Sequence, residues 1–197
     1  MGSKLKKLTI LAETKFLSLY NGEYINKAGN LKSWIIASRK NFKTLNEQFF
    51  DGRKEKVDAV LIAAIHKSSE KLVLVRQFRV PINDYIYEIP AGLIDGDEEI
   101  TAAVKRELKE ETGLELLEIF NESGRQKVYM SPGMTDESVA FVFCTCEGTV
   151  NKDNLEEDED LECILVSREE ARELLNSDTK MDMKVFLILK SFAQGNI

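Results

Sequence analysis

Two glutamates, Glu107 and Glu111, lie four residues apart in a stretch that is typical of a helix. The segment 100–112 contains no Gly or Pro, and Gly113 can adopt the left-handed conformation that ends a helix. This spacing puts both carboxylates on one face, with Cβ atoms about 5–6 Å apart. The apolar residues of the same stripe are Ile100, Ala103, Val104 and Leu108. Two like charges are therefore expected in a buried stripe, which costs several kcal/mol each without compensation.

A hard divalent cation would compensate this charge. Mg²⁺ binds carboxylate oxygens and usually keeps waters and substrate phosphates as its other ligands. The alternative is an ordinary solvated acidic helix. The opposite face of the segment is already polar, formed by Lys105, Lys109 and Thr112. The solvated alternative therefore fits Glu110 and Glu99 better than Glu107 and Glu111, although Glu110 is kept as a candidate ligand and catalytic group.

The stretch around these glutamates resembles the complete Nudix box. Its defined positions are Gly92, five residues, Glu98, seven residues, Arg106-Glu107-Leu108, one residue, Glu110-Glu111, one residue, and Gly113-Leu114. Every one of them is filled, which makes the motif far more specific than a single glycine loop. The resemblance implies a Nudix hydrolase, which uses Mg²⁺, with Mn²⁺ as a substitute, to cleave a nucleoside diphosphate linked to another group.

The resemblance also implies a role for each residue of the box. The metal ligands would be Glu107, Glu111, Glu110 and the backbone carbonyl of Ala91 or Gly92. Metal held there would neutralise the charge of the phosphates and orient the attacking water. Arg106 and Glu98 are expected to brace the loop against the helix through a salt bridge. Gly92 and Gly113 complete the structural positions of the box.

Composition and charge limit the classes of partner. The chain has 197 residues, is 43% hydrophobic, and carries a net charge of −7 with a pI near 5.0. This charge argues against nucleic acid or an anionic membrane as a partner. Three cysteines without framework spacing, and no long apolar stretch, predict a cytoplasmic protein. Cys144 and Cys146 are expected to be small buried apolar residues, and His66, the single histidine, to end a strand.

Periodicity along the chain predicts an α/β fold. Short N-terminal strands are expected at 16–24 and 31–39, and 41–56 is interpreted as a connector. Further strands are expected at 57–65, 72–79, 85–89, 114–120, 127–129, 139–146 and 163–167, and helices at 168–175 and 183–193. This order fits the Nudix fold that the resemblance implies: a mixed β-sheet sandwiched between helices, with a small N-terminal antiparallel sheet. The expected domains are a β module at 1–50 and a Nudix hydrolase domain at 51–197.

Three further stretches resemble the ADP-ribose pyrophosphatase branch of the family. They are Gln77-Phe78-Arg79, Glu88-Ile89-Pro90-Ala91-Gly92 and Ser131-Pro132-Gly133. That branch carries a three-stranded N-terminal module, which is exchanged across a homodimer and contacts the substrate. Two or three short strands are marginal alone, which agrees with such a partner contact. The resemblance implies hydrolysis of ADP-ribose to AMP and ribose 5-phosphate.

The same resemblance implies substrate contacts. Arg79 would hold a phosphate or the terminal ribose through its planar guanidinium, with a salt bridge at the rim as the alternative. Trp34 would stack on adenine, with Arg39 nearby; the alternative is a core or interface aromatic residue. Glu88, which precedes the box, is also expected to contact the substrate. Ile35 follows Trp34 where related members can have an acidic residue, which leaves selectivity for ADP-ribose open.

The acidic run 156–160 is the expected source of the catalytic base. Box glutamates that bind metal are poor proton acceptors, and His66 is remote from the box in sequence. In the branch that the chain resembles, a glutamate of this loop takes the role, and alignment places it at Glu157, with Glu159 next. The alternative is a solvated charge run. A Ca²⁺ site is disfavoured, because the run lacks the alternation and the glycine of an EF-hand.

Two rival functions remain at this stage. Within enzymes, the substrate could be another ADP-sugar or a dinucleotide such as NADH. From a different class, the chain could be a non-catalytic nucleotide-binding module on a Nudix scaffold. An intact box argues against the second, since degenerate boxes usually mark that case.

Overall fold

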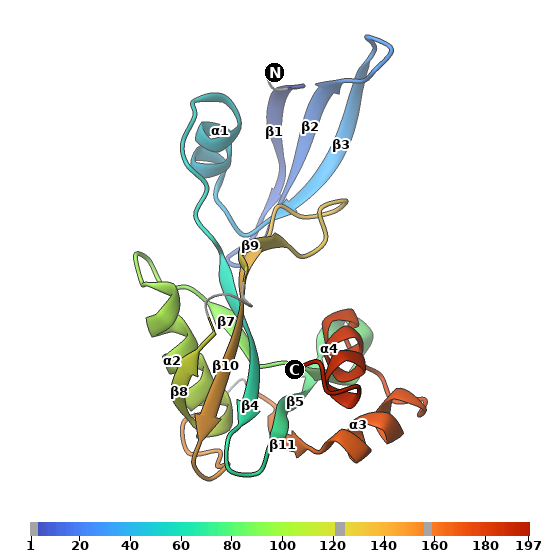
Figure 1. Ribbon diagram of the computed structural model, residues 1–197. Coiled ribbons are helices and arrows are strands. Elements are labelled where there is room, and N and C mark those ends of the chain that lie inside the picture. Colours follow the sequence, from blue (N-terminus) through green and yellow to red (C-terminus); the bar gives the residue numbers. More distant parts are fainter. Residues whose placement is uncertain (1–3, 121–124, 156–158) are drawn as a thin grey trace. The chain divides into compact units, whose positions relative to one another are not determined.

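The computed structural model describes residues 4–120, 125–155 and 159–197, and the chain forms two compact units (Figure 1). Unit 1 combines residues 1–58 with residues 127–139. Unit 2 combines residues 59–126 with residues 140–197. Unit 1 is therefore assembled from two segments that are far apart in the sequence. The bounds of all elements follow for each unit in turn.

Unit 1 contains a three-stranded antiparallel sheet and one helix. The strands β1 (Leu5–Glu13), β2 (Ser18–Ile25) and β3 (Leu31–Ser38) pair in the order β1-β2-β3. Helix α1 (Phe42–Phe50) follows, capped by Asn41, whose side chain accepts from the Thr44 N–H at 2.9 Å. The interpretation of 41–56 as a connector was wrong, because Leu45 of this helix is fully buried with Tyr20 of β2.

The loop at 130–137 also belongs to unit 1. The Ala37 N–H of β3 donates to the Met134 carbonyl at 2.9 Å. Two ion pairs tie the loop to the end of β3: Arg39 with Glu137 and Lys40 with Asp136, each at 2.8 Å. The three-stranded sheet is thus completed by residues about a hundred positions later in the chain, which local sequence patterns do not reveal.

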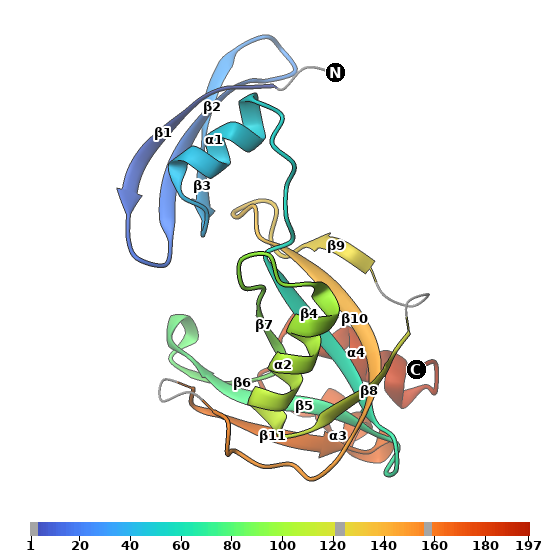
Figure 2. The same cartoon turned by 90° about the vertical axis from the view of Figure 1, so that its left-hand side faces the viewer.

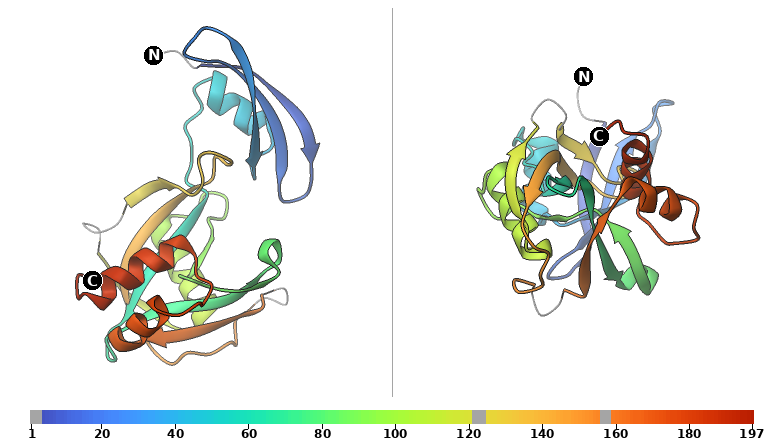
Figure 3. Two further views of the ribbon diagram at one scale, coloured as in Figure 1. Left: turned by 90° about the vertical axis from the view of Figure 1, so that its right-hand side faces the viewer. Right: turned by 60° about the horizontal axis from the view of Figure 1, so that its bottom comes forward.

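Unit 2 is built on a sheet with the strand order β11-β5-β4-β10-β8. The strands of this sheet are β4 (Ala59–His66), β5 (Lys71–Arg79), β6 (Asp84–Glu88), β7 (Ala91–Leu93), β8 (Glu115–Ile119), β9 (Arg125–Tyr129), β10 (Ser138–Glu147) and β11 (Leu161–Val166). Most of β9 and the first two residues of β10 belong to unit 1. Figure 2 shows α2 (Ile100–Thr112) in front of the sheet, and Figure 3 shows α3 (Arg168–Leu175) and α4 (Met183–Ala193) on the opposite face. The expected mixed sheet between helices is confirmed.

Strand β5 pairs with different strands along its length, and this pairing determines how the chain enters the box. The start of β5 pairs with β4, through Ile65↔Leu72, whereas its end pairs with β6, from Val75↔Glu88 onward. Strand β4 instead pairs with β7, and the Ile62 N–H donates to the Pro90 carbonyl at 2.8 Å. The chain leaving β6 therefore passes beside β4 and leads directly into Gly92 and helix α2.

The core of unit 2 explains the cysteines and the histidine. Cys144 and Cys146 are fully buried on β10, as expected, and burial raises the pKa of each thiol to about 12. His66 ends β4, and its ring bonds Ser69 at 2.8 Å and the Gly148 carbonyl at 3.1 Å. The His66 ring thus joins the turn after β4 to the residue that follows β10.

No helix of the described ranges combines the length and the apolar character that crossing a membrane requires.

Candidate functional site

Helix α2 carries the two glutamates as the sequence predicts. It runs from Ile100 to Thr112 and ends at Gly113, which has φ of 76° and donates to the Lys109 carbonyl at 3.0 Å. Ala103, Val104 and Leu108 of the apolar stripe are fully buried, whereas Ile100 at the start of the helix is partly exposed. Glu107 is 8% exposed and Glu111 is 5% exposed on that same side. The prediction that both carboxyl groups lie in the buried stripe is confirmed.

Glu111 is held by the backbone of β7. One of its carboxylate oxygens accepts from the Ala91 N–H at 3.0 Å. Burial raises the pKa of Glu111 well above its usual value, and the charges of Glu107 and Glu159 raise it further. The Ala91 hydrogen bond and the charge of Arg79 act in the opposite direction. An ionised Glu111 is therefore costly unless more positive charge is supplied.

Glu107 packs directly on the α-carbon of Gly92. A Cβ at Gly92 would lie only 1.8–2.1 Å from the Glu107 carboxyl atoms, so any larger residue here would displace that carboxyl group. Burial raises the pKa of Glu107, and the charges of Glu110 and Glu159 add to the effect, whereas Arg106 opposes it. The box loop and the helix thus confine this carboxylate to one place.

Arg106 connects the box loop to the helix. Its Nη2 donates to Glu98 and to the Leu93 carbonyl, both at 2.9 Å. Its Nη1 donates to Glu107 at 2.6 Å and to Glu110 at 3.1 Å. The salt bridge expected between Arg106 and Glu98 is present, and it lowers the pKa of Glu98. The contacts to Glu107 and Glu110 were not foreseen, and they fix both carboxylates from the side of the loop.

Arg79 and Glu88, two predicted substrate residues, form a pair at the end of β5. The Nε and Nη2 of Arg79 donate to one Glu88 oxygen at 2.9 and 2.6 Å. The charge of Arg79 also lowers the pKa of Glu111, so the guanidinium lies in the surroundings of the glutamates. The pair adds a half-exposed cation at the candidate site.

The acidic run contributes one described glutamate to the same surroundings. Glu157 lies outside the described residues, together with its neighbours 156 and 158. Glu159 is described, and its charge raises the pKa of both Glu107 and Glu111. The end of this loop therefore lies close to the two buried carboxyl groups.

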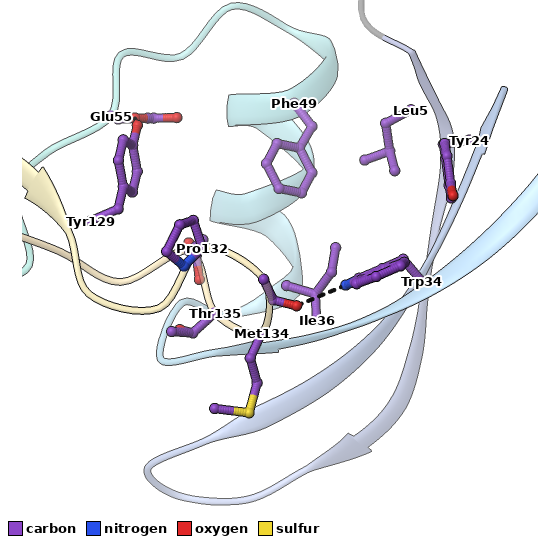
Figure 4. A pocket seen from close by; sticks show the side chains of 12 residues that line it. Leu5, Tyr24, Trp34, Ile36, Phe49, Glu55, Tyr129, Pro132, Met134 and Thr135 are labelled. Atoms are coloured by element: carbon purple, nitrogen blue, oxygen red, sulfur yellow. Dashed lines mark hydrogen bonds between the residues drawn. The ribbon is translucent and has the colours of Figure 1, made fainter. Parts of the chain in front are cut away.

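Trp34 lines a pocket of about 440 Å³ that lies within unit 1 (Figure 4). Its indole Nε1 donates to the Gly133 carbonyl at 3.0 Å, and the residue is 54% exposed. Other lining residues are Leu5, Tyr24, Ile36, Phe49, Glu55, Tyr129, Pro132, Met134, Thr135 and Asp136. Arg39 does not line the pocket and pairs with Glu137. Sequence reasoning missed Phe49 and Tyr129, because both come from segments that were not assigned to this sheet.

The donor set on α2 is compatible with a hard divalent cation. It consists of carboxyl oxygens, and Mg²⁺ is usually bound by one or two carboxylates together with waters and phosphates. Across the described residues, no three His, Cys, Asp or Glu side chains form a complete metal cage. The close packing of Glu107 on Gly92 and the burial of Glu111 provide two confined carboxylates for such a cation.

Substitution of Gly92 by alanine tests the confinement of Glu107. The added Cβ overlaps the carboxyl group, which is the end of a flexible side chain, so the group moves while the fold persists. We expect activity to fall about 10²-fold, because displacing a reactive group by 1 Å has that effect. Stability should fall by about 1–3 kcal/mol. In a Glu107→Ala background the stability cost of Gly92→Ala should vanish, and a persisting cost in thermal unfolding would contradict the proposed overlap.

Comparisons with known proteins agree on one family. The NUDIX domain family matches residues 55–186. "Putative nudix hydrolase 2" of Caenorhabditis elegans is 31% identical over 141 residues, which is 68% of this chain. "ADP-ribose pyrophosphatase" of Bacillus subtilis is 37% identical over 128 residues, or 64% of this chain. The chain spans only 62% and 66% of the lengths of these two relatives.

The fold is also similar to a solved structure over the full chain. A crystal structure described as an ADP compounds hydrolase superposes with a TM-score of 0.72. The match covers 100% of this chain and 96% of the other, at 18% sequence identity. At this identity the likeness establishes a shared fold, including elements of both units.

Proposed function

Since the chain belongs to the Nudix family, whose members use divalent cations, we propose that it hydrolyses the pyrophosphate bond of a nucleoside diphosphate derivative. The proposed substrate is ADP-ribose, with AMP and ribose 5-phosphate as products. The observation that carries the proposal is the pair of buried glutamates on α2, confined by the backbone at Ala91 and Gly92. The similarity to the Bacillus subtilis ADP-ribose pyrophosphatase supports the choice of substrate.

The proposed metal is Mg²⁺, with Mn²⁺ as a substitute. The residues proposed to hold it are Glu107, Glu111, Glu110 and the Ala91 carbonyl. When bound, such a cation neutralises the negative charge of the diphosphate. The chain prepares the site by two contacts: Arg106 holds the carboxylates of Glu107 and Glu110, and the Ala91 N–H holds that of Glu111.

Arg79 is proposed to bind a phosphate or the terminal ribose. Its side chain is 46% exposed, and Glu88 accepts from its Nε and Nη2. Because the planar guanidinium has five N–H donors, it can keep the pair with Glu88 and still donate to a phosphate. In this proposal Glu88 orients Arg79, and the positive charge compensates part of the acidic surroundings.

A carboxylate of the acidic run is proposed to accept the proton of the attacking water. Such a base must come within about 2.6–3.2 Å of the water once the substrate is bound. Glu159 is the described candidate, since its charge acts on both Glu107 and Glu111. Glu157 remains a proposal from the sequence. Glu110 is a weaker candidate, because its carboxylate is engaged by Arg106 at 3.1 Å.

The pocket at Trp34 is proposed to receive the adenine base. The exposed indole supplies an aromatic face, and its N–H is already bonded to Gly133. Stacking of a base on an aromatic side chain contributes about 1–3 kcal/mol. Trp34→Ala should therefore raise the KM for ADP-ribose by roughly 5- to 150-fold, with less effect on kcat, whereas Trp34→Phe should retain part of the affinity. An unchanged KM in steady-state kinetics of Trp34→Ala would refute stacking.

The chain is further proposed to form a homodimer in which the N-terminal module, residues 1–50, contacts the domain 51–197 of the partner. The face of the three-stranded sheet opposite Tyr20 exposes apolar residues, among them Leu19 and Ile35, which are 38% and 51% exposed. A three-stranded sheet gains stability by covering such a face. Light scattering should give twice the chain mass, and a fully active monomer would refute the dimer.

A substrate panel tests the proposed activity directly. ADP-ribose, another ADP-sugar and NADH would each be incubated with Mg²⁺ or Mn²⁺, and the products identified. ADP-ribose should give the highest kcat/KM. Faster turnover of NADH or of another ADP-sugar would identify that compound as the substrate and leave the proposed pyrophosphate hydrolysis unchanged. Calorimetric binding of ADP-ribose without turnover in either metal would point to a non-catalytic module.

A further inference from the structure

Asp160, the last residue of the acidic run, is fastened to two strands. Its carbonyl oxygen accepts from the Phe78 N–H of β5 at 3.0 Å, next to the pair Leu161↔Gln77. Its carboxylate accepts from the Tyr85 hydroxyl of β6 at 2.5 Å. The main chain of Asp160 is thus bonded to one strand and its side chain to the following strand, which defines where the acidic loop joins the sheet.

The register of the sheet places these side chains in one row. Phe78 of β5 and Tyr85 of β6 are direct cross-strand partners. Asp160 bonds to Phe78 from the opposite edge of β5. The rings of Phe78 and Tyr85 meet edge to face, with centroids 5.6 Å apart. The guanidinium of Arg76 lies 4.6 Å from the centre of the Tyr85 ring and pairs with Glu162 of β11 at 3.2 Å. These contacts restrict the orientation of the Tyr85 ring.

The position of Asp160 also sets the direction of the preceding side chain. In an extended chain, successive side chains point to opposite faces of the sheet. With Asp160 on the Tyr85 face, Glu159 is directed to the opposite face, on which α2 packs. The charge of Glu159 does act on Glu107 and Glu111 of that helix. Cys163 lies four residues further on the same side as Glu159; burial raises the pKa of its thiol, and the charge of Glu111 adds to the effect.

We propose that Tyr85 is a positioning residue, which holds the Asp160 carboxylate and thereby fixes the direction in which Glu159 projects. This inference rests on the proposed function, because it gives Glu159 a task in the hydrolysis. Tyr85 itself touches no reacting atom in this proposal. Its removal should therefore lower the rate of the chemical step and leave substrate binding nearly unchanged.

The kinetic test compares matched tyrosine substitutions. Tyr85→Phe should lower kcat roughly tenfold, less than the 10²-fold effect of a full 1 Å displacement, with KM nearly unchanged. Tyr87→Phe removes a hydroxyl two residues along the same strand face and should keep the wild-type kcat. Asp160→Asn retains an acceptor oxygen, so its loss should be smaller than that of Asp160→Ala. Tyr85→Phe should cause no additional loss in a Glu159→Gln background.

Hydrogen exchange supplies a readout that does not depend on activity. The Phe78 amide donates to Asp160, so its exchange should accelerate in Tyr85→Phe and stay unchanged in Tyr87→Phe. The inference is overturned by an unchanged kcat in Tyr85→Phe, by an equal additional loss in the Glu159→Gln background, or by unchanged exchange. If the wild-type chain hydrolysed no diphosphate, the proposed function would be wrong, and Tyr85 could not position a catalytic base. Hydrogen exchange would still test whether Tyr85 holds Asp160 in place.

Discussion

Glu111→Gln should lower kcat about 10²–10⁴-fold, because a cation at this site contributes several kcal/mol to the stabilisation of the transition state. The substitution keeps an oxygen that can accept from the Ala91 N–H, so the local structure should persist. It removes one charge from a side chain that is 5% exposed. Steady-state kinetics in saturating Mg²⁺ measure the effect, and a wild-type rate would remove Glu111 from the site.

The same variant should be as stable as the wild type, or more stable, without metal. Burial holds the pKa of Glu111 well above its usual value, so the folded chain keeps this proton to higher pH than the unfolded chain. The wild-type protein should therefore lose stability as pH rises from about 4.5 through the raised pKa. Glu111→Gln should lack this loss. Chemical denaturation of the metal-free proteins across that pH range would show the difference.

Glu159→Gln should lower kcat about 10²–10⁴-fold, the usual contribution of a general base. Its affinity for Mg²⁺ should stay near that of the wild type, since Glu159 is not among the proposed ligands. Glu157→Gln is the matched comparison, two residues earlier in the same acidic run. Strong loss in Glu157→Gln with normal turnover in Glu159→Gln would move the base to Glu157. Normal turnover in both variants would remove the loop from the mechanism.

Helix α2 and the buried glutamates could be predicted because their signals are local. The bounds Ile100–Thr112, the left-handed Gly113 and the shared stripe all follow from helix geometry and residue type. The two C-terminal helices and the strands other than β1 and β7 were likewise predicted to within a few residues, since each has its own apolar pattern. The ion pair of Arg106 and Glu98 followed from the resemblance of the box and is present.

The parts that were missed depend on contacts between distant residues. Helix α1 has a mixed, charged sequence, and its burial rests on Leu45 meeting Tyr20 across the small sheet. The contact of Tyr85 with Asp160 spans 75 positions and depends on the register of three strands. Strand β1 was also not assigned, because most of its side chains are exposed and only Leu8 is buried. No periodic pattern marks such features.

The discontinuous composition of unit 1 has a consequence for the order of folding during synthesis. The hydrogen bond from Trp34 to Gly133 closes a loop of 99 residues, and the ion pair of Lys40 with Asp136 closes one of 96. At about 5–20 residues per second, a ribosome needs roughly 5–20 s to add that length. The first three strands thus leave the ribosome well before the residues that complete their pocket. During this interval the indole of Trp34 lacks its Gly133 partner, and the apolar residues that line the pocket from the N-terminal segment stay exposed to non-native contacts.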